Sequence, residues 1–208
     1  MPGDLLLLDT DIVSQIGRQR PPPGLREWLT ALGPPRLAIS FPSIAELRRG
    51  SHLLEKTYPA KAAAISEWVD EVLDLGFQML PMTPSVAAVY AKMTSTQSLR
   101  SMWTVQRGAK QNRLGHDLMV ASIAIVHKVP ILTGNSRDYL RLDELFPLPG
   151  VYNPLHRTWH VKPRREVELP PWGSPGDHPG HACLPRIREN DEIIVRHRWP
   201  QKTSLLAR

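Results

Sequence analysis

The chain has 208 residues, of which 41% are hydrophobic, and this is enough apolar material for one compact core with an appendage rather than for several domains. Its single cysteine, Cys183, excludes an intramolecular disulfide framework and favours a reducing compartment, so we expect a cytoplasmic protein. The apolar run at residues 5–8 is much shorter than the roughly 20 residues of a membrane span, so we expect no membrane association.

The formal net charge of +6 is spread unevenly along the chain. Residues 1–150 carry 16 Lys and Arg against 14 Asp and Glu, whereas residues 151–208 carry 10 against 6. A basic surplus favours polyanionic partners, although modest positive charge is also common on ordinary protein surfaces. A polar stretch at residues 97–113 predicts a long internal loop or a frayed helix. The basic residues of this stretch are Arg100, Arg107, Lys110 and Arg113.

Three short apolar runs that end in polar residues predict strands buried on both faces, at residues 5–8, 36–40 and 129–133. The stretches between them have helical spacing, and several begin with proline, which the first turn of a helix accepts. We expect helices at residues 24–32, 42–54, 59–75, 84–93 and 115–127. Strands that alternate with helices predict an α/β fold in which helices cover a parallel sheet.

The character of the sequence changes at about residue 151. The last 58 residues hold eight of the 21 prolines, five of the eight histidines and three of the six tryptophans. Proline lacks a backbone donor and fixes its own φ, so such a segment sustains neither a helix nor a central strand. We predict a domain at residues 1–153 and a basic, poorly ordered extension at 154–208, with one strand-like piece at 192–195. We expect the domain to fold without this extension.

Acidic and amide side chains stand where the predicted strands end, or where the helix before the last strand begins: Asp9, Asp11, Glu46, Asp117, Asn135 and Asp138. Ligands bind at this edge of an open parallel sheet. Clustered carboxylates raise one another's pKa unless a cation neutralises them. Oxygen ligands without clustered His or Cys suit Mg²⁺ or Mn²⁺, and such ions activate water for attack on a phosphodiester. The set therefore predicts metal-dependent phosphodiester hydrolysis.

Each of these residues also has an ordinary structural role open to it. Asp117 can be a helix N-cap, and Glu46 can be a solvated helical carboxylate. Asn135 and Asp138 can be turn residues. Asp9 is harder to explain in this way, because an acid directly after a buried apolar run needs compensation. The histidine beside Asp117 has no second histidine at metal-ligand spacing, so we interpret it as structural.

Four segments carry the strongest sequence signal: LLLLDTDIV at residues 5–13, SIAELRRG at 43–50, HDLMVASIA at 116–124 and VPILTGNSRDY at 129–139. Taken together, in this order and at these separations, they resemble the PIN domain. The members they resemble most are the VapC-type toxins of bacterial type II toxin–antitoxin pairs. The resemblance spans about residues 4–153 and does not cover the extension.

The resemblance implies a three-layer PIN-like fold, Mg²⁺- or Mn²⁺-dependent endoribonuclease activity on an RNA substrate, a homodimer, and inhibition by a cognate antitoxin protein. Asp9, Glu46 and Asp117 fall on the first three acids of the family, so the resemblance implies that they hold the ion. Either Asn135 or Asp138 falls on the fourth position of the catalytic site.

Two positions beside these motifs depart from the family. Asp11 stands where relatives often have Asn or Ser, and we expect it to be a hydrogen-bond acceptor or helix cap rather than a metal ligand. Gly134 stands where many relatives have a basic or polar residue.

Two other functions are compatible with parts of the sequence. LLLLDTDIV also resembles the first motif of haloacid-dehalogenase-type phosphatases, in which Asp9 would be the nucleophile and Asp11 the acid/base, with Thr133 in their second motif. That family needs a later lysine, and after Thr133 only Lys162 and Lys202 remain, both in the extension. A PIN-like scaffold that binds RNA or a partner without cleavage is the third hypothesis, and the retained acids argue against it.

Overall fold

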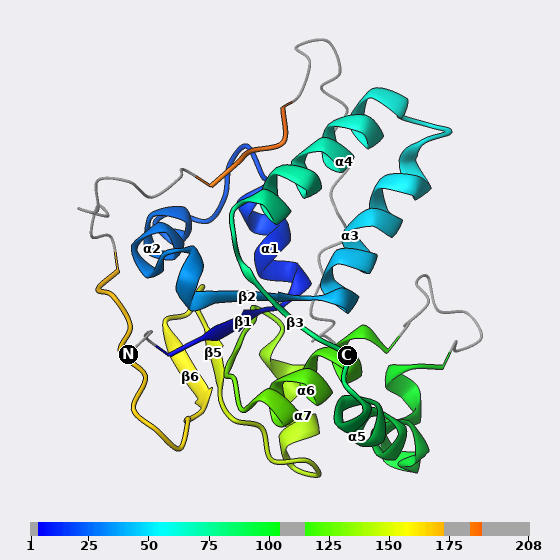
Figure 1. Cartoon of the computed structure of the whole chain (residues 1–208), viewed down its shortest axis with the longest axis vertical. Coiled ribbons are helices and arrows are strands. Elements are labelled where there is room, and N and C mark those ends of the chain that lie inside the picture. Colours follow the sequence, from blue (N-terminus) through cyan, green and yellow to red (C-terminus); the bar gives the residue numbers. More distant parts are fainter. Residues whose placement is uncertain (1–3, 105–114, 173–183, 189–208) are drawn as a thin grey trace, which may run out of the picture.

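The computed structural model describes residues 4–104, 115–172 and 184–188. They form an α/β fold around a six-stranded sheet with the strand order β3-β2-β1-β4-β5-β6 (Figure 1). All neighbouring strands are parallel except β5 and β6. The strands are β1 (Leu6–Leu8), β2 (Leu37–Ser40), β3 (Gln78–Leu80), β4 (Ile131–Leu132), β5 (Val151–Asn153) and β6 (Thr158–Val161).

Helices fill the connections between the parallel strands. They are α1 (Thr10–Ile16), α2 (Leu25–Leu32), α3 (Phe41–Leu54), α4 (Pro59–Asp74), α5 (Pro84–Ser95), α6 (His116–His127) and α7 (Ser136–Asp143), with the 3-10 turns η1 (Pro34–Arg36) and η2 (Gln97–Met102). Within the described part of the chain, none of the helices has the length and apolar character needed to cross a membrane.

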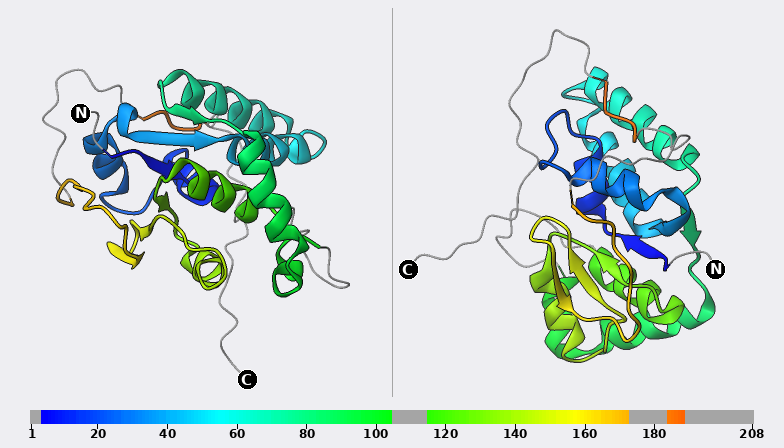
Figure 2. Two further views of the ribbon diagram at one scale, coloured as in Figure 1. Left: turned by 60° about the horizontal axis from the view of Figure 1, so that its bottom comes forward. Right: turned by 90° about the vertical axis from the view of Figure 1, so that its left-hand side faces the viewer.

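The helices cover both faces of the sheet, which makes three layers (Figure 2). Side chains alternate between the two faces along a strand. In β1, Leu6 and Leu8 therefore pack with the apolar residues of α1–α4, whereas Leu7 packs with those of α5–α7. The three-layer α/β fold expected from the sequence is confirmed.

The three predicted strands and five predicted helices are all present close to their expected bounds. The sequence analysis missed α1, α7, β3, β5 and β6. None of these is longer than eight residues, so apolar spacing has few positions in which to show. In the stretch at 97–113, the predicted loop begins with η2, and residues 105–114 lie outside the described residues.

Part of the extension packs on the folded body. β6 lies after residue 153 and pairs with β5, so the strand-like piece predicted at 192–195 is not the only one in the extension. Residues 192–195 themselves lie outside the described residues. Leu184 is 4% exposed and belongs to the core on the α1–α4 side. Other residues of the extension are partly buried against the same core: Leu155, Trp159, Val167, Leu169, Trp172 and Ile187.

Candidate functional site

Asp9 stands at the middle of the carboxyl edge of the sheet. It directly follows β1, which lies between β2 and β4, and it is the N-cap of α1. Only 4% of its surface is exposed. Its Oδ1 accepts a 2.8 Å hydrogen bond from the Thr10 amide, and its Oδ2 accepts a 2.8 Å hydrogen bond from the Thr133 hydroxyl. Both carboxylate oxygens are thus held by neutral donors.

Burial and neighbouring acids raise the pKa of Asp9. Loss of hydration is the main cause, and the charges of Asp11, Asp117 and Glu46 act in the same direction. The hydrogen bond from Thr133 acts against them. The fold therefore brings three further acids close to Asp9, two of them from helices distant in sequence. A cation would stabilise an ionised Asp9 in this place, because it would replace the lost hydration and offset the repulsion.

Glu46 and Asp117 come from α3 and α6, two helices in contact. The Glu46 Oε2 lies 3.3 Å from Nδ1 of His116, the histidine that the sequence analysis interpreted as structural. Asp117 is the second residue of α6, whose N-cap is Gly115 with a φ of 70°. Helix capping therefore does not account for Asp117, and its charge acts on Asp9.

Asp11 joins the start of α1 to the loop after β4. Its Oδ2 accepts a 2.8 Å hydrogen bond from the Gly134 amide, in agreement with its expected role as an acceptor. A Cβ atom at position 134 would lie 2.9 Å from that oxygen and 3.0 Å from Cδ1 of Leu155. A larger residue at position 134 would therefore displace the ends of two side chains, Asp11 and Leu155, which approach this backbone closely.

Asn135 and Asp138, the two candidates for the fourth position, contact each other. Asn135 Nδ2 donates a 2.9 Å hydrogen bond to Asp138 Oδ2, and the Asn135 amide donates a 2.9 Å hydrogen bond to Thr133 Oγ1. The Thr133 hydroxyl in turn donates to Asp9. The backbone of Asn135 is therefore linked to Asp9 through Thr133, and the side chain of Asn135 is linked to Asp138.

Tyr139 is a residue at this site that the sequence analysis did not single out. It is fully buried, and burial followed by the charges of nearby acids raises the pKa of its phenol. Its hydroxyl interacts with Asp9, yet neither this hydroxyl nor that of buried Thr10 makes a regular hydrogen bond to a described group. A sequence signal existed in the three-residue spacing of the buried face of α7: Ser136, Tyr139 and Leu142.

The donors at this edge fit a hard divalent cation, because they are carboxylate, hydroxyl and amide oxygens. Within residues 4–104, 115–172 and 184–188, no three His, Cys, Asp or Glu side chains stand together as a preformed metal site. The acids nevertheless lie close enough for Asp11, Asp117 and Glu46 to raise the pKa of Asp9. The buried hydroxyls of Thr10 and Tyr139 add further polar groups beside the acids.

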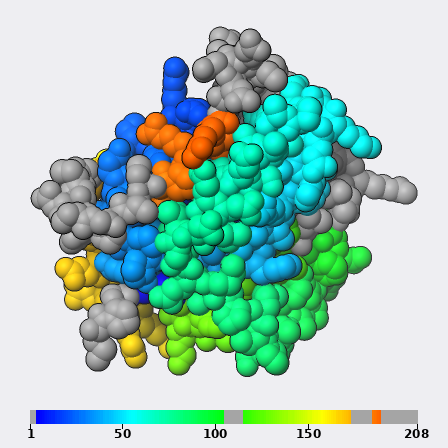
Figure 3. All heavy atoms as spheres, turned by 45° about the horizontal axis from the view of Figure 1, so that its top comes forward, coloured from blue at the N-terminus to red at the C-terminus, as the bar shows by residue number. Residues whose placement is uncertain are grey.

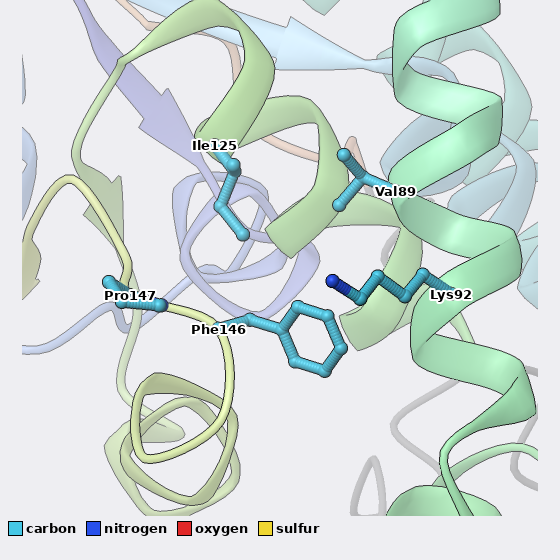
Figure 4. Close-up of a pocket in the computed structure, with 5 residues that line it drawn as sticks. All are labelled: Val89, Lys92, Ile125, Phe146 and Pro147. Carbon is cyan, nitrogen blue, oxygen red and sulfur yellow. The ribbon is translucent and has the colours of Figure 1, made fainter.

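A small pocket lies away from this edge (Figure 4). Its walls are mainly apolar, and Lys92 Nζ lies 6.0 Å from the ring centre of Phe146. Ile125, which lines the pocket, lies near the C-terminal end of α6. It is about 12 Å along the helix axis from Asp117, which lies at the start of the same helix. The pocket is therefore separate from the acidic edge, the part of the carboxyl edge of the sheet that carries Asp9, Asp11, Glu46 and Asp117. Its lining residues are Val89, Lys92, Ile125, Phe146 and Pro147.

Solved structures with a similar fold include two Fit complexes. FitAcB from Neisseria gonorrhoeae matches with 27% identity and a TM-score of 0.54, over 73% of this chain and 99% of that chain. FitAB bound to an IR36 DNA fragment matches with 25% identity and a TM-score of 0.56, over 75% and 99%. VapBC-5 from Mycobacterium tuberculosis, of the VapBC family of toxin–antitoxin systems, has 23% identity and a TM-score of 0.41, over 70% and 94%.

No curated protein sequence matches this chain. The sequence profile of the PIN domain does match it, over residues 6–145. This range contains every part of the acidic edge described above, from Asp9 after β1 to Tyr139 in α7. It covers more than half of the chain and agrees with the three-layer fold. The chain therefore belongs to the PIN domain family.

Proposed function

We propose that the protein is a metal-dependent endoribonuclease of the VapC type, the toxin of a toxin–antitoxin pair, which hydrolyses RNA phosphodiester bonds at the acidic edge. One observation carries the proposal. Asp9 is buried beside three other acids, and its two hydrogen-bond partners are neutral. Membership of the PIN domain family, whose members are in general nucleases, supports the same function.

In this proposal Asp9, Glu46 and Asp117 hold Mg²⁺ or Mn²⁺. A bound ion of this kind activates water and stabilises charge on the phosphodiester. Asp9 is held for this task by the Thr10 amide and the Thr133 hydroxyl, which fix both of its oxygens. Defined carboxylate positions matter because a ligand that is loosely held binds its ion less well.

The remaining residues of the edge orient these acids. His116 lies beside Glu46 and restricts its side chain. The backbone N–H of Asn135 donates to the hydroxyl oxygen of Thr133, and the hydroxyl proton of Thr133 is therefore directed at Asp9. We propose Asn135 as the fourth residue of the site, with Asp138 holding its side-chain amide in place.

RNA is the proposed substrate because of the resemblance to VapC-type toxins and the positive net charge of the chain. Two exposed cations stand near the acids in sequence: Arg49, three residues after Glu46 in α3, and Arg137, next to Asp138 in α7. Cations beside an acidic site attract the phosphate backbone that the acids themselves repel.

A protein partner belongs to the proposal as well. FitAcB and FitAB are complexes, and this chain matches almost the full length of one of their chains. We propose a cognate antitoxin that inhibits the nuclease, and a homodimer of the nuclease in the cytoplasm. Large apolar side chains are exposed on the described surface and are candidates for these contacts: Phe41, Leu53, Met79, Met82 and Trp103.

The experiment is cleavage of total cellular RNA by purified, antitoxin-free protein with Mg²⁺, Mn²⁺ or EDTA. Asp9→Asn and Asp117→Asn keep the side-chain shape and remove the charge. Asp74→Asn, at an exposed acid at the end of α4, is the matched control. We expect metal-dependent cleavage that falls by about 10²–10³-fold in the two site variants, a loss typical of a transition-state electrostatic group, and that persists in the control.

Other outcomes identify the alternative functions. Folded wild-type protein that binds RNA in Mg²⁺ and leaves it intact contradicts the proposal and supports a scaffold. Hydrolysis of a small phosphomonoester that Asp11→Asn abolishes supports the phosphatase. In a phosphatase Asp11 would deliver a proton, whereas in this structure its Oδ2 accepts the Gly134 amide.

A further inference from the structure

Residues 184–188, here called the strap, lie across α1 and α4 on the side of the sheet away from α5–α7 (Figure 3). Leu184 is buried in the core, and Ile187 is partly buried against it. The strap is not a strand of the sheet. It is a segment without regular secondary structure that packs on a surface made by helices, and side chains of those helices donate hydrogen bonds to its main chain.

The strap is held mainly through its main-chain carbonyl groups. The buried Arg26 of α2 donates hydrogen bonds to the carbonyl oxygens of Leu184 and Pro185, and to that of Ile16 at the end of α1. Trp68 Nε1 of α4 donates to the Pro185 carbonyl oxygen at 3.2 Å. Carbonyl groups occur in every peptide, so these donors recognise an extended backbone whatever its sequence.

Two features add selectivity for side chains. A Cβ atom on Gly17 would lie 2.7 Å from Cε2 of Trp68 and 3.0 Å from Cδ1 of Ile187, so the glycine makes room for the indole of Trp68 and for the isoleucine beside it. The Ile187 amide donates to the Gly17 carbonyl oxygen at 3.1 Å, which sets the register of the strap. With Leu184 in the core, this surface accepts two apolar side chains three residues apart.

The strap lies outside the part of the chain that defines the family. The PIN domain profile ends at residue 145, and FitAcB is matched over 99% of its chain by 73% of this one. The groove itself, made by α1, α2 and α4, lies within the profile. Arg26 keeps the Ile16 carbonyl as an acceptor within the groove, and its remaining donors favour an occupant that presents carbonyl groups.

We propose that α1, α2 and α4 form a binding groove for an extended peptide of the pattern Leu-x-x-Ile, and that the strap is an exchangeable ligand which occupies it within the same chain. A segment of the same pattern supplied by another molecule displaces the strap. The inference does not depend on the nuclease chemistry, because no residue of the acidic edge takes part.

The test uses the full chain with Leu184→Asp and Ile187→Asp, which releases the strap and keeps Arg26, Trp68 and Gly17. The probe is a synthetic peptide of residues 184–190 with an N-terminal fluorophore, and a peptide with Asp at both apolar positions is the control. Fluorescence anisotropy measures binding. We expect the Kd of the double variant for the probe to be at least tenfold lower than that of the wild type, in which the strap competes for the groove. The double variant should show no binding of the control peptide.

A folded double variant that binds neither peptide, or binds both equally, overturns the proposal. If the double variant does not fold, hydrogen exchange of the wild type decides. The Ile187 amide is protected by its bond to Gly17, and unlabelled probe peptide in excess of the roughly millimolar effective concentration of a tethered segment should increase its exchange rate. Exchange that the peptide leaves unchanged overturns the proposal.

Discussion

The acidic edge differs from the groove that binds the strap, which is made by α1, α2 and α4, in the surroundings of its buried polar groups. At the edge, Asp9 is buried beside other acids, and the buried hydroxyl of Tyr139 makes no regular hydrogen bond to a described group. In the groove, the large buried donors have acceptors. Arg26 and Trp68 donate to carbonyl oxygens of the strap, and Trp28 Nε1 donates to the Pro170 carbonyl oxygen at 3.0 Å.

The acidic edge thus places like charges together in a buried position, whereas the groove pairs its buried donors with carbonyl groups of the same chain. Buried polar groups without suitable partners destabilise a fold, and a ligand that satisfies them recovers that free energy as binding. The acidic edge therefore destabilises the ligand-free protein, whereas the strap groove stabilises it. Removal of the buried charge of Asp9 should therefore raise the stability of the ligand-free protein, whereas removal of the strap should lower it.

The largest effect on stability is expected from removal of residues 154–208. This deletes the buried Leu184, uncovers Trp28 and Trp68, and leaves Arg26 without its acceptors in the strap. Loss of a buried leucine side chain such as that of Leu184 alone costs about 2–5 kcal/mol, and about 2–4 °C of Tm accompanies each kcal/mol in a chain of this size. We expect a Tm at least about 10 °C lower in thermal unfolding, or an insoluble product.

The matched control for that deletion ends the chain after residue 188 and so keeps the strap. Its Tm should stay within about 3 °C of the wild type, which corresponds to roughly 1 kcal/mol. From the sequence alone we expected the domain to fold without its extension. A soluble chain of residues 1–153 with an unchanged Tm would restore that expectation and remove the stabilising role of the strap.

A medium effect is expected from Gly134→Ala, which acts on the acidic edge. The new methyl group meets Oδ2 of Asp11 and Cδ1 of Leu155, and overpacking of this kind costs about 1–3 kcal/mol. We expect a lower Tm and slower RNA cleavage. Leu155→Ala in the same chain should restore part of the Tm through a favourable coupling energy. Strictly additive effects would show that crowding against Leu155 is not the cause.

The smallest effect on stability is expected from Tyr139→Phe. In EDTA the variant should unfold within about 1 kcal/mol of the wild type, because the hydroxyl makes no regular hydrogen bond there. With Mn²⁺ the gain in Tm should be smaller than that of the wild type, because the phenol no longer supports Asp9. Tyr152→Phe, whose phenol is shifted by burial and Arg157 rather than by the acids, should keep the full gain. An equal gain in all three proteins would exclude a role for Tyr139 at the site.

The acids could be predicted from the sequence because each stands next to a strong local signal. Asp9 follows a run of leucines, and Asp117 opens a long apolar helix, so parallel topology places them at one edge. The position of Gly134 became clear only from the fold, since Asp11 and Leu155 approach it from distant parts of the chain.

The packing of the extension could not be predicted in the same way. Proline-rich sequence has no apolar period, and the strap is held through carbonyl groups, which leave no mark on residue type. Tyr139 was missed because α7 is short and its buried tyrosine resembles ordinary core. Local pattern thus located the candidate acids, whereas contacts between distant segments determine what supports them.

The most direct test of the cation site is the Tm of the wild type and of Asp9→Asn from about pH 5 to about pH 8, in EDTA and in Mn²⁺. The folded pKa of Asp9 lies above its ordinary value of 3.8, so its ionisation weakens the folded state. In EDTA, the contribution of Asp9 to wild-type stability should be highest below that ordinary value and fall as pH rises through the raised pKa.

We predict that Asp9→Asn has the higher Tm in EDTA and the flatter pH dependence, and that Mn²⁺ raises the Tm of the wild type alone. An asparagine retains an oxygen for the Thr10 amide, and its side-chain NH₂ can donate to the Thr133 hydroxyl. A variant less stable than the wild type in EDTA, with Mn²⁺ raising both proteins equally, would contradict the assignment of this edge as a cation site.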